Sequence, residues 1–261
     1  MYAKKAALPF TKNEVNEMEN ITGYLHSVET AGTLDGPGVR RVLFLNGCPL
    51  KCVYCHNPDT RRYKGGLKTD AYTELRGIAR QKDMLKSMNG GVTLSGGEPL
   101  WQPEFVKAIL EGSKMMGLHT ALDTSGFLGN KADDELLSLT DLVLLDIKHF
   151  DPEGYKRVTG VDLKPTLDFA ERLASKKIPV WLRFVLVPGY TDNMKAIRKM
   201  ADYVHRLGNV ERVEVLPFHK MGEYKWEALE MDYKLFDIQE PTAELIAQTK
   251  AQFEKEGMLV Y

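Results

Sequence analysis

The stretch NGCPLKCVYCHN, residues 46–57, contains every cysteine of this 261-residue chain. Cys48, Cys52 and Cys55 follow the spacing C-x3-C-x2-C, and His56 comes directly after the last of them. Disulfides use cysteines in pairs, and a closed tetrahedral metal site uses four protein ligands, so three thiols fit neither arrangement. The motif therefore raises the question of which group needs three thiolates within eight residues and no fourth.

Two explanations of the motif need no catalysis. One is a zinc-stabilised binding module with a structural Cys3His site, in which the adjacent Cys55 and His56 would have to bend back onto one ion. The other is a set of buried, inert cysteines, although three so close together are unusual for a core. The third explanation is a [4Fe–4S] cluster, which normally takes four cysteine thiolates. With three thiolates, one iron keeps an open position, which is what a metal uses to bind a reactant.

Length and composition limit the class of protein. The chain is 43% hydrophobic and 27% charged, as in ordinary globular proteins, and it is long enough for one α/β barrel or two small domains. The formal net charge of -1 gives no basic bias toward nucleic acid, and no apolar run approaches the roughly 20 residues of a membrane span. Residues 1–20 lack the apolar core of a secretory signal and are predicted to be a polar extension. We therefore expect a cytoplasmic, reducing location, where clustered thiols favour metal binding or catalysis, and neither a nucleic-acid nor a membrane partner.

Six short Val/Leu-rich runs, mostly bounded by Gly, Pro, Asp or Asn, are typical of buried parallel strands. These runs are residues 41–47, 91–96, 119–124, 142–148, 180–187 and 210–219. Stretches with helical spacing alternate with them, at residues 69–88, 102–116, 133–139, 166–178, 193–207 and 242–254. The alternation predicts an α/β fold with a parallel sheet, in a single domain of about six βα units.

Polar residues and glycines stand at the points where these strands end. In chain order they are Cys48, Gly96, Gly97, Glu98, Asp123, Thr124, Asp146, Lys148 and His219, while Arg183 lies within the fifth strand. The carboxyl ends of the strands in a β/α barrel form one face, and active sites lie on that face. Because a buried charge is costly unless it is paired, we expect these residues to surround one site at the mouth of the barrel.

The motif and its surroundings resemble a known family. C-x3-C-x2-C after the first strand, with an aromatic residue before the last cysteine, is the signature of radical S-adenosylmethionine (SAM) enzymes, and SGGEP at 95–99 looks like their GGE motif. Further segments are similar to the pyruvate formate-lyase-activating enzymes, a radical SAM family that activates glycyl-radical enzymes. They are GTLDGPGVR (32–40), YCHNPDT (54–60), GGVTLSGGE (90–98), LDTSGF (122–127), DLVLLDIK (141–148), VWLRFVLVPGYTD (180–192) and VEVLPFHKMGEYKW (213–226). The resemblance extends over residues 21–261.

The resemblance implies a fold and a reaction. The fold is a single-domain, partial (open) (β/α)6 barrel over residues 21–261. An oxidoreductase of this family cleaves SAM reductively at one [4Fe–4S] cluster, and the resulting 5′-deoxyadenosyl radical takes a hydrogen atom from a glycine Cα of pyruvate formate-lyase. This activation belongs to anaerobic glucose metabolism. The alternatives within the superfamily are the activation of another glycyl-radical enzyme and a different radical SAM reaction.

The resemblance also implies which residues contact each group. Cys48, Cys52 and Cys55 would ligate three irons of the cluster. The residues implied to contact SAM are Tyr54, Cys55, His56, Gly97, Asp146, Ile147, Lys148 and His219. A monovalent cation is implied at Asp123, Thr124 and Asp146. Contacts to the glycyl loop of the partner are implied at Asp35, Arg183 and His56.

Several of these residues also have a purely structural explanation. Gly96 and Gly97, and the DGPG sequence at 35–38, are typical of turns. Asp146 and Lys148 lie two residues apart on a strand, on the same side, where an ion pair would form without any ligand. A lone histidine such as His219 is more often a hydrogen-bonded core residue than a ligand contact.

The chain departs from many glycyl-radical activating enzymes in one respect. Those enzymes carry an inserted segment with extra cysteines, whereas this chain has no cysteine beyond the motif. It is therefore expected to hold a single cluster and to take its electron from an external donor, such as a reduced flavodoxin or ferredoxin. We expect a monomer whose protein substrate is pyruvate formate-lyase.

Overall fold

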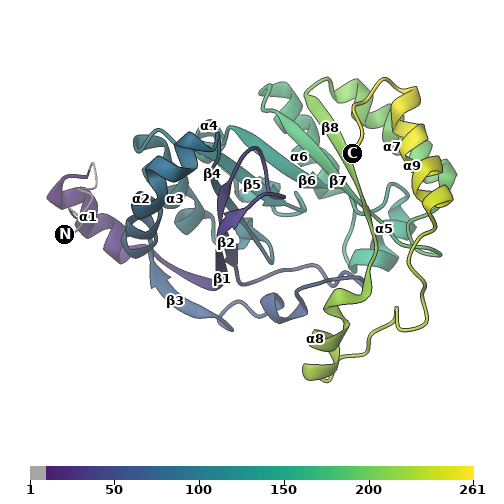
Figure 1. Cartoon of the computed structure of the whole chain (residues 1–261), viewed down its shortest axis with the longest axis horizontal. Helices are drawn as coiled ribbons and strands as arrows, with labels where there is room; N and C mark the ends of the chain where they lie inside the picture. The colour runs from purple at the N-terminus through teal and green to yellow at the C-terminus, as the bar shows by residue number, and fades with distance from the viewer. Residues whose placement is uncertain (1–9) are drawn as a thin grey trace.

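The computed structural model describes residues 10–261 and shows one open, curved sheet of eight strands (Figure 1). The strands are β1 Thr22–Gly32, β2 Arg40–Leu45, β3 Leu67–Asp70, β4 Gly91–Gly96, β5 His119–Thr124, β6 Leu142–Asp146, β7 Val180–Leu186 and β8 Val210–Pro217. Their order across the sheet is β3-β1-β2-β4-β5-β6-β7-β8, and β2, β4, β5, β6, β7 and β8 are parallel. These six correspond to the six predicted strands, and the predicted open (β/α)6 barrel is confirmed.

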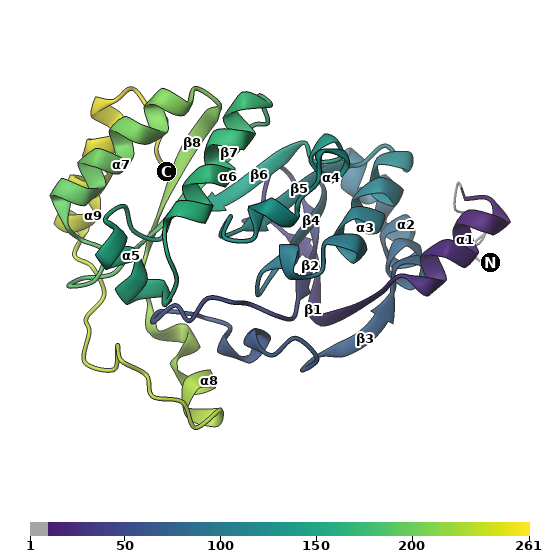
Figure 2. The ribbon, with the colours of Figure 1, turned by 180° about the vertical axis from the view of Figure 1, so that it is seen from behind.

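Helices connect the parallel strands and cover one side of the sheet (Figure 2). They are α1 Lys12–Asn20, α2 Ala71–Ser87, α3 Pro103–Met115, α4 Asp134–Ser138, α5 Pro152–Thr159, α6 Lys164–Ser175, α7 Met194–Leu207, α8 Glu223–Ala228 and α9 Ala243–Lys255. The predicted helical stretches match α2, α3, α4, α6, α7 and α9. The short helices α5 and α8 lie outside the predicted stretches, and both contact the cysteine loop.

Burial and capping explain why these elements form where they do. The first four residues of β6, Leu142–Leu145, are all buried, because the strand faces the barrel interior on one side and helices on the other. At the start of α7, the side chain of Asn193 accepts hydrogen bonds from the backbone of Lys195 and Ala196. At its end, Gly208 takes the left-handed conformation (φ 72°) that stops a helix.

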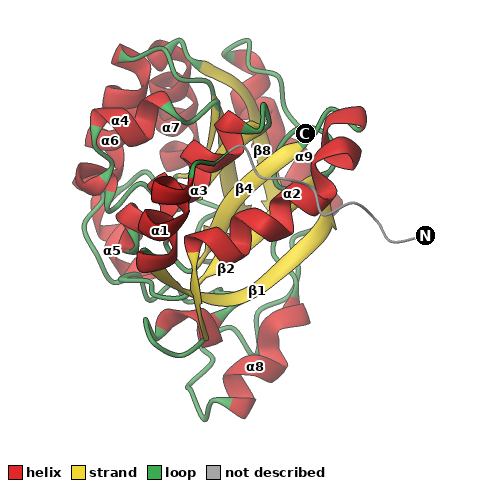
Figure 3. Ribbon diagram, turned by 90° about the vertical axis from the view of Figure 1, so that its left-hand side faces the viewer, coloured by secondary structure: helices red, strands yellow, loops and turns green. Residues whose placement is uncertain are grey.

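Two strands lie outside the predicted set. β1 pairs antiparallel with β2, and β3 pairs antiparallel with β1, so the parallel sheet has an antiparallel edge. β1 is long and curved (Figure 3), and many of its side chains are exposed. A half-exposed strand has no continuous apolar run, and its stability comes from hydrogen bonds to a neighbour.

Residues 12–20, part of the predicted polar extension, form α1. Thr11 and Glu14 form a capping box at its start, and Met18 is buried where α1 packs against α2. Residues 1–9 of the predicted extension lie outside the described residues. None of the helices in residues 10–261 has the length and hydropathy that crossing a membrane requires.

The topology determines where the site lies. Parallel strands end at the same edge of the sheet, and the β2–β3 loop with the cysteines begins at this edge. In Figures 1 and 2 this loop runs along the lower side of the sheet, toward α5 and α8. The two legs of the loop lie side by side, because Gly47 N donates to Thr60 O (2.7 Å) and Cys48 N donates to Arg61 O (3.3 Å).

Candidate cluster and S-adenosylmethionine site

A cavity of about 340 Å³ lies at the carboxyl ends of the parallel strands. Its size is that of a small-molecule site, and it brings together most of the predicted site residues. Its lining includes Asp35, Cys48, Cys52, Tyr54, Cys55, His56, Gly96, Gly97, Asp123, Thr124, Asp146, Lys148 and Arg183. Asp35 and Arg183, which are 148 positions apart in sequence, thus share one cavity.

The cysteine loop faces the cavity with alternate residues. Every second residue from position 48 to position 54 lines the cavity, whereas Lys51 is exposed. Two backbone hydrogen bonds hold this extended segment against the end of α5. They join Lys51 N to Thr159 O (2.7 Å) and Val53 N to Val158 O (3.0 Å). The spacing of the cysteines therefore places their thiols on one side of the loop.

The three thiols are free, and their environment suits an inorganic cluster. Burial raises the pKa of Cys52 to about 12 and also raises the pKa of Cys48, so both thiols stay protonated without a cation. A metal removes these protons when it binds, because a coordinating thiol is deprotonated. Within residues 10–261 no three Cys, His, Asp or Glu side chains converge as the ligands of one metal ion. All three cysteines line the same cavity.

Tyr54 indicates a polar ligand in the cavity. Its hydroxyl is buried and has no hydrogen-bond partner within residues 10–261. Its ring faces Lys148, whose Nζ lies 5.8 Å from the ring centroid. Buried polar groups are normally hydrogen-bonded, so the free hydroxyl and the three thiols together fit a site that takes a cluster and SAM.

Lys148 forms an ion pair with Asp146 in the wall of the cavity, with 3.1 Å between Nζ and Oδ2. Burial acts to lower the pKa of Lys148, but Asp146 and Tyr54 together hold it well above its usual value. The ammonium group therefore stays charged and is placed beside the cysteine loop. This pair is the one expected from the two-residue strand period, and it leaves a fixed positive charge available to an anionic ligand group.

His56 and His219 form a pair beside the cavity. Their ring centroids are 4.1 Å apart, and His56 Nε2 lies 3.2 Å from His219 O. Burial, followed by the proximity of His219, lowers the pKa of His56, which keeps that ring neutral. The buried Nδ1 of His219 has no hydrogen-bond partner among the described residues. Ile147, by contrast, has a fully buried side chain in the hydrophobic core, so only its backbone is available to a ligand.

Glu98 is fully buried and does not line the cavity. Its carboxylate accepts hydrogen bonds from Leu100 N (3.1 Å), Thr124 Oγ1 (2.6 Å) and the backbone and hydroxyl of Ser125. Burial raises its pKa, although these donors oppose the increase. Glu98 therefore joins the end of β4 to the end of β5 and so supports the walls of the cavity.

Gly97 is required by the close approach of the cysteine loop. A Cβ at this position would lie 2.5 Å from Gly47 O, and Gly97 N donates to Leu45 O (2.8 Å). Gly96 has a φ of 114°, which few other residues adopt, and a Cβ there would also strike Leu45. The glycine pair thus has a packing role in addition to the predicted contact with SAM.

Arg183 neutralises three carboxylates at the mouth of the cavity. Its guanidinium lies 3.0 Å from Glu214, 3.3 Å from Asp123 and 3.5 Å from Asp35, and it also donates to Leu34 O. Burial alone would lower its pKa, but these carboxylates raise it instead. This network connects β7 and β8 to the loop that follows β1.

The predicted cation residues Asp123, Thr124 and Asp146 all line the cavity. Burial raises the pKa of Asp123 to about 6; Asp146 contributes to the increase, and Arg183 opposes it. The hydroxyl of Ser95 donates to Asp123 at 2.6 Å. The Thr124 hydroxyl donates to Glu98 and accepts from Gly126 N (3.0 Å), so its oxygen keeps one lone pair for a cation.

Two residues that the sequence analysis did not single out hold the cysteine loop. Trp226 Nε1 donates to Cys55 O (2.8 Å), and Arg61 Nη2 donates to Cys52 O (2.7 Å). The Arg61 guanidinium stacks on the Trp226 ring, 4.7 Å from its centroid. Trp226 ends the VEVLPFHKMGEYKW segment, but no spacing rule could connect it to a loop 171 positions earlier.

Replacing Trp226 with phenylalanine is expected to loosen the cluster without unfolding the protein. The change keeps an aromatic ring and removes one hydrogen bond, about 1 kcal/mol, from the peptide unit of Cys55. Iron should therefore be removed by a chelator about five-fold faster, and this rate is the measurement. Trp181→Phe is the matched control, since it removes a similar bond to Glu211 on β8. Equal chelation rates in the two variants would contradict the role of Trp226.

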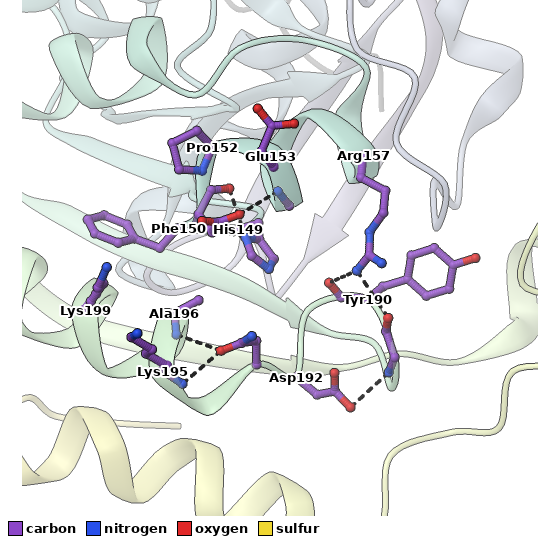
Figure 4. Close-up of a pocket in the computed structure, with 14 residues that line it drawn as sticks. His149, Phe150, Pro152, Glu153, Arg157, Tyr190, Asp192, Lys195, Ala196 and Lys199 are labelled. Atoms are coloured by element: carbon purple, nitrogen blue, oxygen red, sulfur yellow. Dashed lines mark hydrogen bonds between the residues drawn. The ribbon is translucent and has the colours of Figure 1, made fainter.

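A larger hollow of about 720 Å³ lies at the N-terminal ends of α5 and α7 (Figure 4). Its polar groups already bind nearby backbone. Arg157 donates to Gly189 O and Tyr190 O, both at 3.2 Å, and Asn193 caps α7. None of the predicted site residues lines this hollow, so its size does not make it the candidate site.

Known proteins share both the sequence and the fold. The model of the radical SAM superfamily matches residues 42–201. The chain is 47% identical over 219 residues to the pyruvate formate-lyase-activating enzyme of Clostridium pasteurianum, which covers 84% of this chain and 92% of that relative. It is 39% identical over 240 residues to the pyruvate formate-lyase 1-activating enzyme of Escherichia coli K12, covering 91% of this chain and 98% of that relative.

Solved structures agree with this similarity. A domain of the pyruvate-formate lyase-activating enzyme from Bacteroides vulgatus matches with a TM-score of 0.56 at 27% identity, covering 66% of this chain and 98% of that domain. Streptococcus suis SuiB, bound to its precursor peptide, matches with a TM-score of 0.64 at 16% identity, covering 87% of this chain and 49% of SuiB, which shows a common fold. These relationships exclude the zinc-stabilised binding module. The chain belongs to the radical SAM superfamily and, within it, to the family of pyruvate formate-lyase-activating enzymes.

Proposed function

We propose that this chain activates a pyruvate formate-lyase by producing a glycyl radical in it, with SAM and one [4Fe–4S] cluster as cofactors. The observation that carries the proposal is the single cavity shared by three free thiols, the Asp146–Lys148 pair and the Asp35–Arg183 mouth. The high identity to activating enzymes along nearly their whole length supports this choice of protein substrate.

Cys48, Cys52 and Cys55 are the residues that would hold the cluster, and three thiolates leave one iron for the amino and carboxylate groups of SAM. When bound, the cluster and SAM together supply a 5′-deoxyadenosyl radical by one-electron reductive cleavage. The protein contributes placement and charge. Leu50 and Tyr54 wall the thiol side of the cavity, and the buried setting excludes water from it.

The SAM contacts are assigned by charge and position. Lys148 would neutralise the SAM carboxylate, and the Gly97 backbone would accept or donate at the amino group. Tyr54, His56 and His219 would border the adenosine, for which the free Tyr54 hydroxyl and the free His219 Nδ1 are available. The backbones of Cys55 and Ile147, with Asp146, complete the proposed set.

A monovalent cation is proposed beside the SAM carboxylate, at Asp123, Thr124 and Asp146. Burial, with smaller contributions from Asp146 and Asp35, raises the pKa of Asp123 although Arg183 lowers it, and a further carboxylate from SAM would add to the repulsion. A cation would offset that repulsion. On the partner side, Asp35, Arg183 and His56 would hold the glycyl loop at the mouth.

Electron paramagnetic resonance tests the proposed function directly. The cluster-loaded protein is incubated anaerobically with dithionite, SAM and pyruvate formate-lyase, and a glycyl radical is expected on the partner together with 5′-deoxyadenosine. SAM cleavage without a glycyl radical would point to a different substrate. No SAM cleavage by a fully loaded protein would contradict the proposal.

Replacing Asp35 with asparagine is expected to separate two activities. Asp35 pairs with Arg183 at 3.5 Å, which is a long contact, so the fold should tolerate the change. Uncoupled SAM cleavage with dithionite should stay within about two-fold, while glycyl-radical formation should fall about ten-fold or more, as for the loss of a charged partner contact. The two rates are measured on the same preparation. The control is Asp162→Asn, which removes the acidic partner of an exposed ion pair with Lys156. If Asp35→Asn lowers SAM cleavage and glycyl-radical formation equally, Asp35 is assigned to SAM binding instead.

We further propose that the protein works as a monomer, in a reducing cytoplasm, with a flavodoxin or ferredoxin as external donor. Three free thiols in one loop support a reducing location, because cluster assembly needs them reduced. We also propose that residues 1–20 are an extension to the barrel of residues 21–261. The end of α1 at Asn20 and the start of β1 at Thr22 support this boundary.

A further inference from the structure

We infer that the outer face of the cysteine loop is the docking surface for an acidic protein that delivers one electron. Four residues, Lys51, Arg61, Arg62 and Lys64, form this surface, which we call the basic loop face. The inference rests on the proposed function, because it concerns the electron donor that a single cluster requires. It adds to that function the place where the donor binds and the charge that the donor must carry.

The charge of the loop differs from that of the whole chain. Residues 51–68 contain five basic residues and one acidic residue, a net charge of +4, in a chain whose net charge is -1. The acidic residue, Asp59, is already paired with His26 (2.8 Å) and Lys225 (3.1 Å). Within residues 10–261, none of the four side chains of the basic loop face forms an ion pair. Their positive charge is therefore available to a partner.

The geometry places Lys51 and Arg61 beside the cysteines. The loop turns residues 48, 50, 52 and 54 toward the cavity, while Lys51 is exposed. Arg61 donates to the carbonyl oxygen of Cys52, so its guanidinium lies beside a thiol-bearing residue. Arg62 and Lys64 follow on the adjacent leg of the loop and are exposed. A protein that binds here approaches the cysteines from the side opposite to the proposed SAM site.

The back of the cysteine loop is the side from which an electron donor can approach the cluster. The proposed SAM and the glycyl loop of the substrate enzyme occupy the cavity and its mouth, and electron transfer weakens steeply with distance. A donor must therefore come close to the back of the cysteine loop. In the transfer, the donor loses one electron and the bound cluster gains it, with no proton or other reactant involved.

An unpaired basic surface is suited to the brief binding of an acidic electron donor. Electron-transfer complexes are small and transient, and complementary charge raises their association rate. Arg61 stacks on the ring of Trp226 in α8. Glu227 and Glu230 follow Trp226 in the chain and are exposed. Negative charge there would repel an anionic donor from α8 and direct it to the loop. A negatively charged flavodoxin or ferredoxin fits this description.

Charge reversal tests the docking surface. The variant Lys51→Glu/Arg62→Glu/Lys64→Glu leaves Arg61 in place, because Arg61 holds Cys52. The control variant Arg76→Glu/Arg198→Glu/Lys255→Glu makes the same change in net charge at exposed positions of α2, α7 and α9. Reduced flavodoxin is the probe. Cluster reduction is followed by stopped-flow absorbance at several ionic strengths, and flavodoxin binding is titrated with the cluster-free protein.

At low ionic strength the loop variant should be reduced by flavodoxin at least ten-fold more slowly than the unmodified protein, and its rate should depend little on salt. Its affinity for flavodoxin should fall in parallel, with the control variant within about two-fold of the unmodified protein. The single variant Lys51→Gln should show a smaller loss in the same direction, and it serves if the triple variant does not fold.

The dithionite reaction separates this inference from the proposed function. Dithionite-driven glycyl-radical formation should be unchanged in the loop variant, so a failure of the unmodified protein in that assay concerns the function alone. Unchanged flavodoxin rates and affinity in the loop variant would overturn the inference. An equal loss in the control variant, or a loss of dithionite-driven activation with the cluster intact, would also overturn it.

Discussion

Replacing Cys52 with serine is expected to abolish cluster binding and, with it, all SAM cleavage and glycyl-radical formation. Cys52 lines the cavity between the other two cysteines, and a serine oxygen is a poor substitute for the soft thiolate that iron–sulfur clusters require. The barrel should remain folded, because the side chain changes by a single atom. Iron and sulfide content, the brown absorbance of the cluster and 5′-deoxyadenosine production are the measurements.

His56→Ala is the matched control for this prediction. In a Cys3His zinc site the histidine would be a ligand, and its loss would release metal. In the cluster site it is not a ligand, so iron content should stay near that of the unmodified protein while SAM binding weakens. A Cys52→Ser protein with full iron and turnover, or a His56→Ala protein without iron, would contradict the ligand assignment.

Replacing Arg183 with alanine is expected to have the largest effect on stability. The change leaves Asp123 and Asp35 without a cation, while Glu214 keeps its ion pair with Arg212. Removing one partner of a buried charge network costs about 3–5 kcal/mol, because the remaining charges stay buried and unpaired. For a domain of this size the melting temperature should fall by roughly 10 °C, which differential scanning calorimetry measures.

The conservative variant Arg183→Lys distinguishes charge from geometry. Lysine keeps one positive charge but lacks the planar guanidinium that contacts several carboxylates at once. It should therefore recover about half of the lost stability. The alanine variant should also regain stability as the pH falls. With Arg183 present, burial already raises the pKa of Asp123 to about 6, and the loss of Arg183 raises that pKa further, so Asp123 becomes protonated and needs no counter-charge. A melting temperature for Arg183→Ala that is unchanged at all pH values would show that the network does not stabilise the fold.

Most of the parallel strands were predictable because they are buried on both sides. Continuous apolar runs such as LVLLD of β6 have no exposed face, so composition alone marks them. β1 and β3 were not predictable in this way. Many of their residues are exposed. What holds them is the pairing of β1 with β2 and of β3 with β1, contacts that no local pattern records.

The site shows the same division. The spacing of Cys48, Cys52 and Cys55 indicated a cluster, and a strand period placed Asp146 and Lys148 together. The hydrogen bond from Trp226 to Cys55 and the approach of Arg183 to Asp35 depend on chain segments that meet only in the folded barrel. His219 was expected at the SAM site, and the structure places its ring against His56 rather than in the cavity lining.

The sequence by itself determined the fold class and the edge of the sheet where the site lies, and it predicted the ligand set of the cluster. These features depend on local periodicity and on the chemistry of single residue types, which the order of residues contains directly. Only the tertiary structure decided how charge is distributed around the site, with Arg183 neutralised at the mouth and the basic residues of the loop unpaired at its back. Whether a charge is paired depends on distances between segments far apart in the chain, and those distances exist only after the sheet has closed around the cavity.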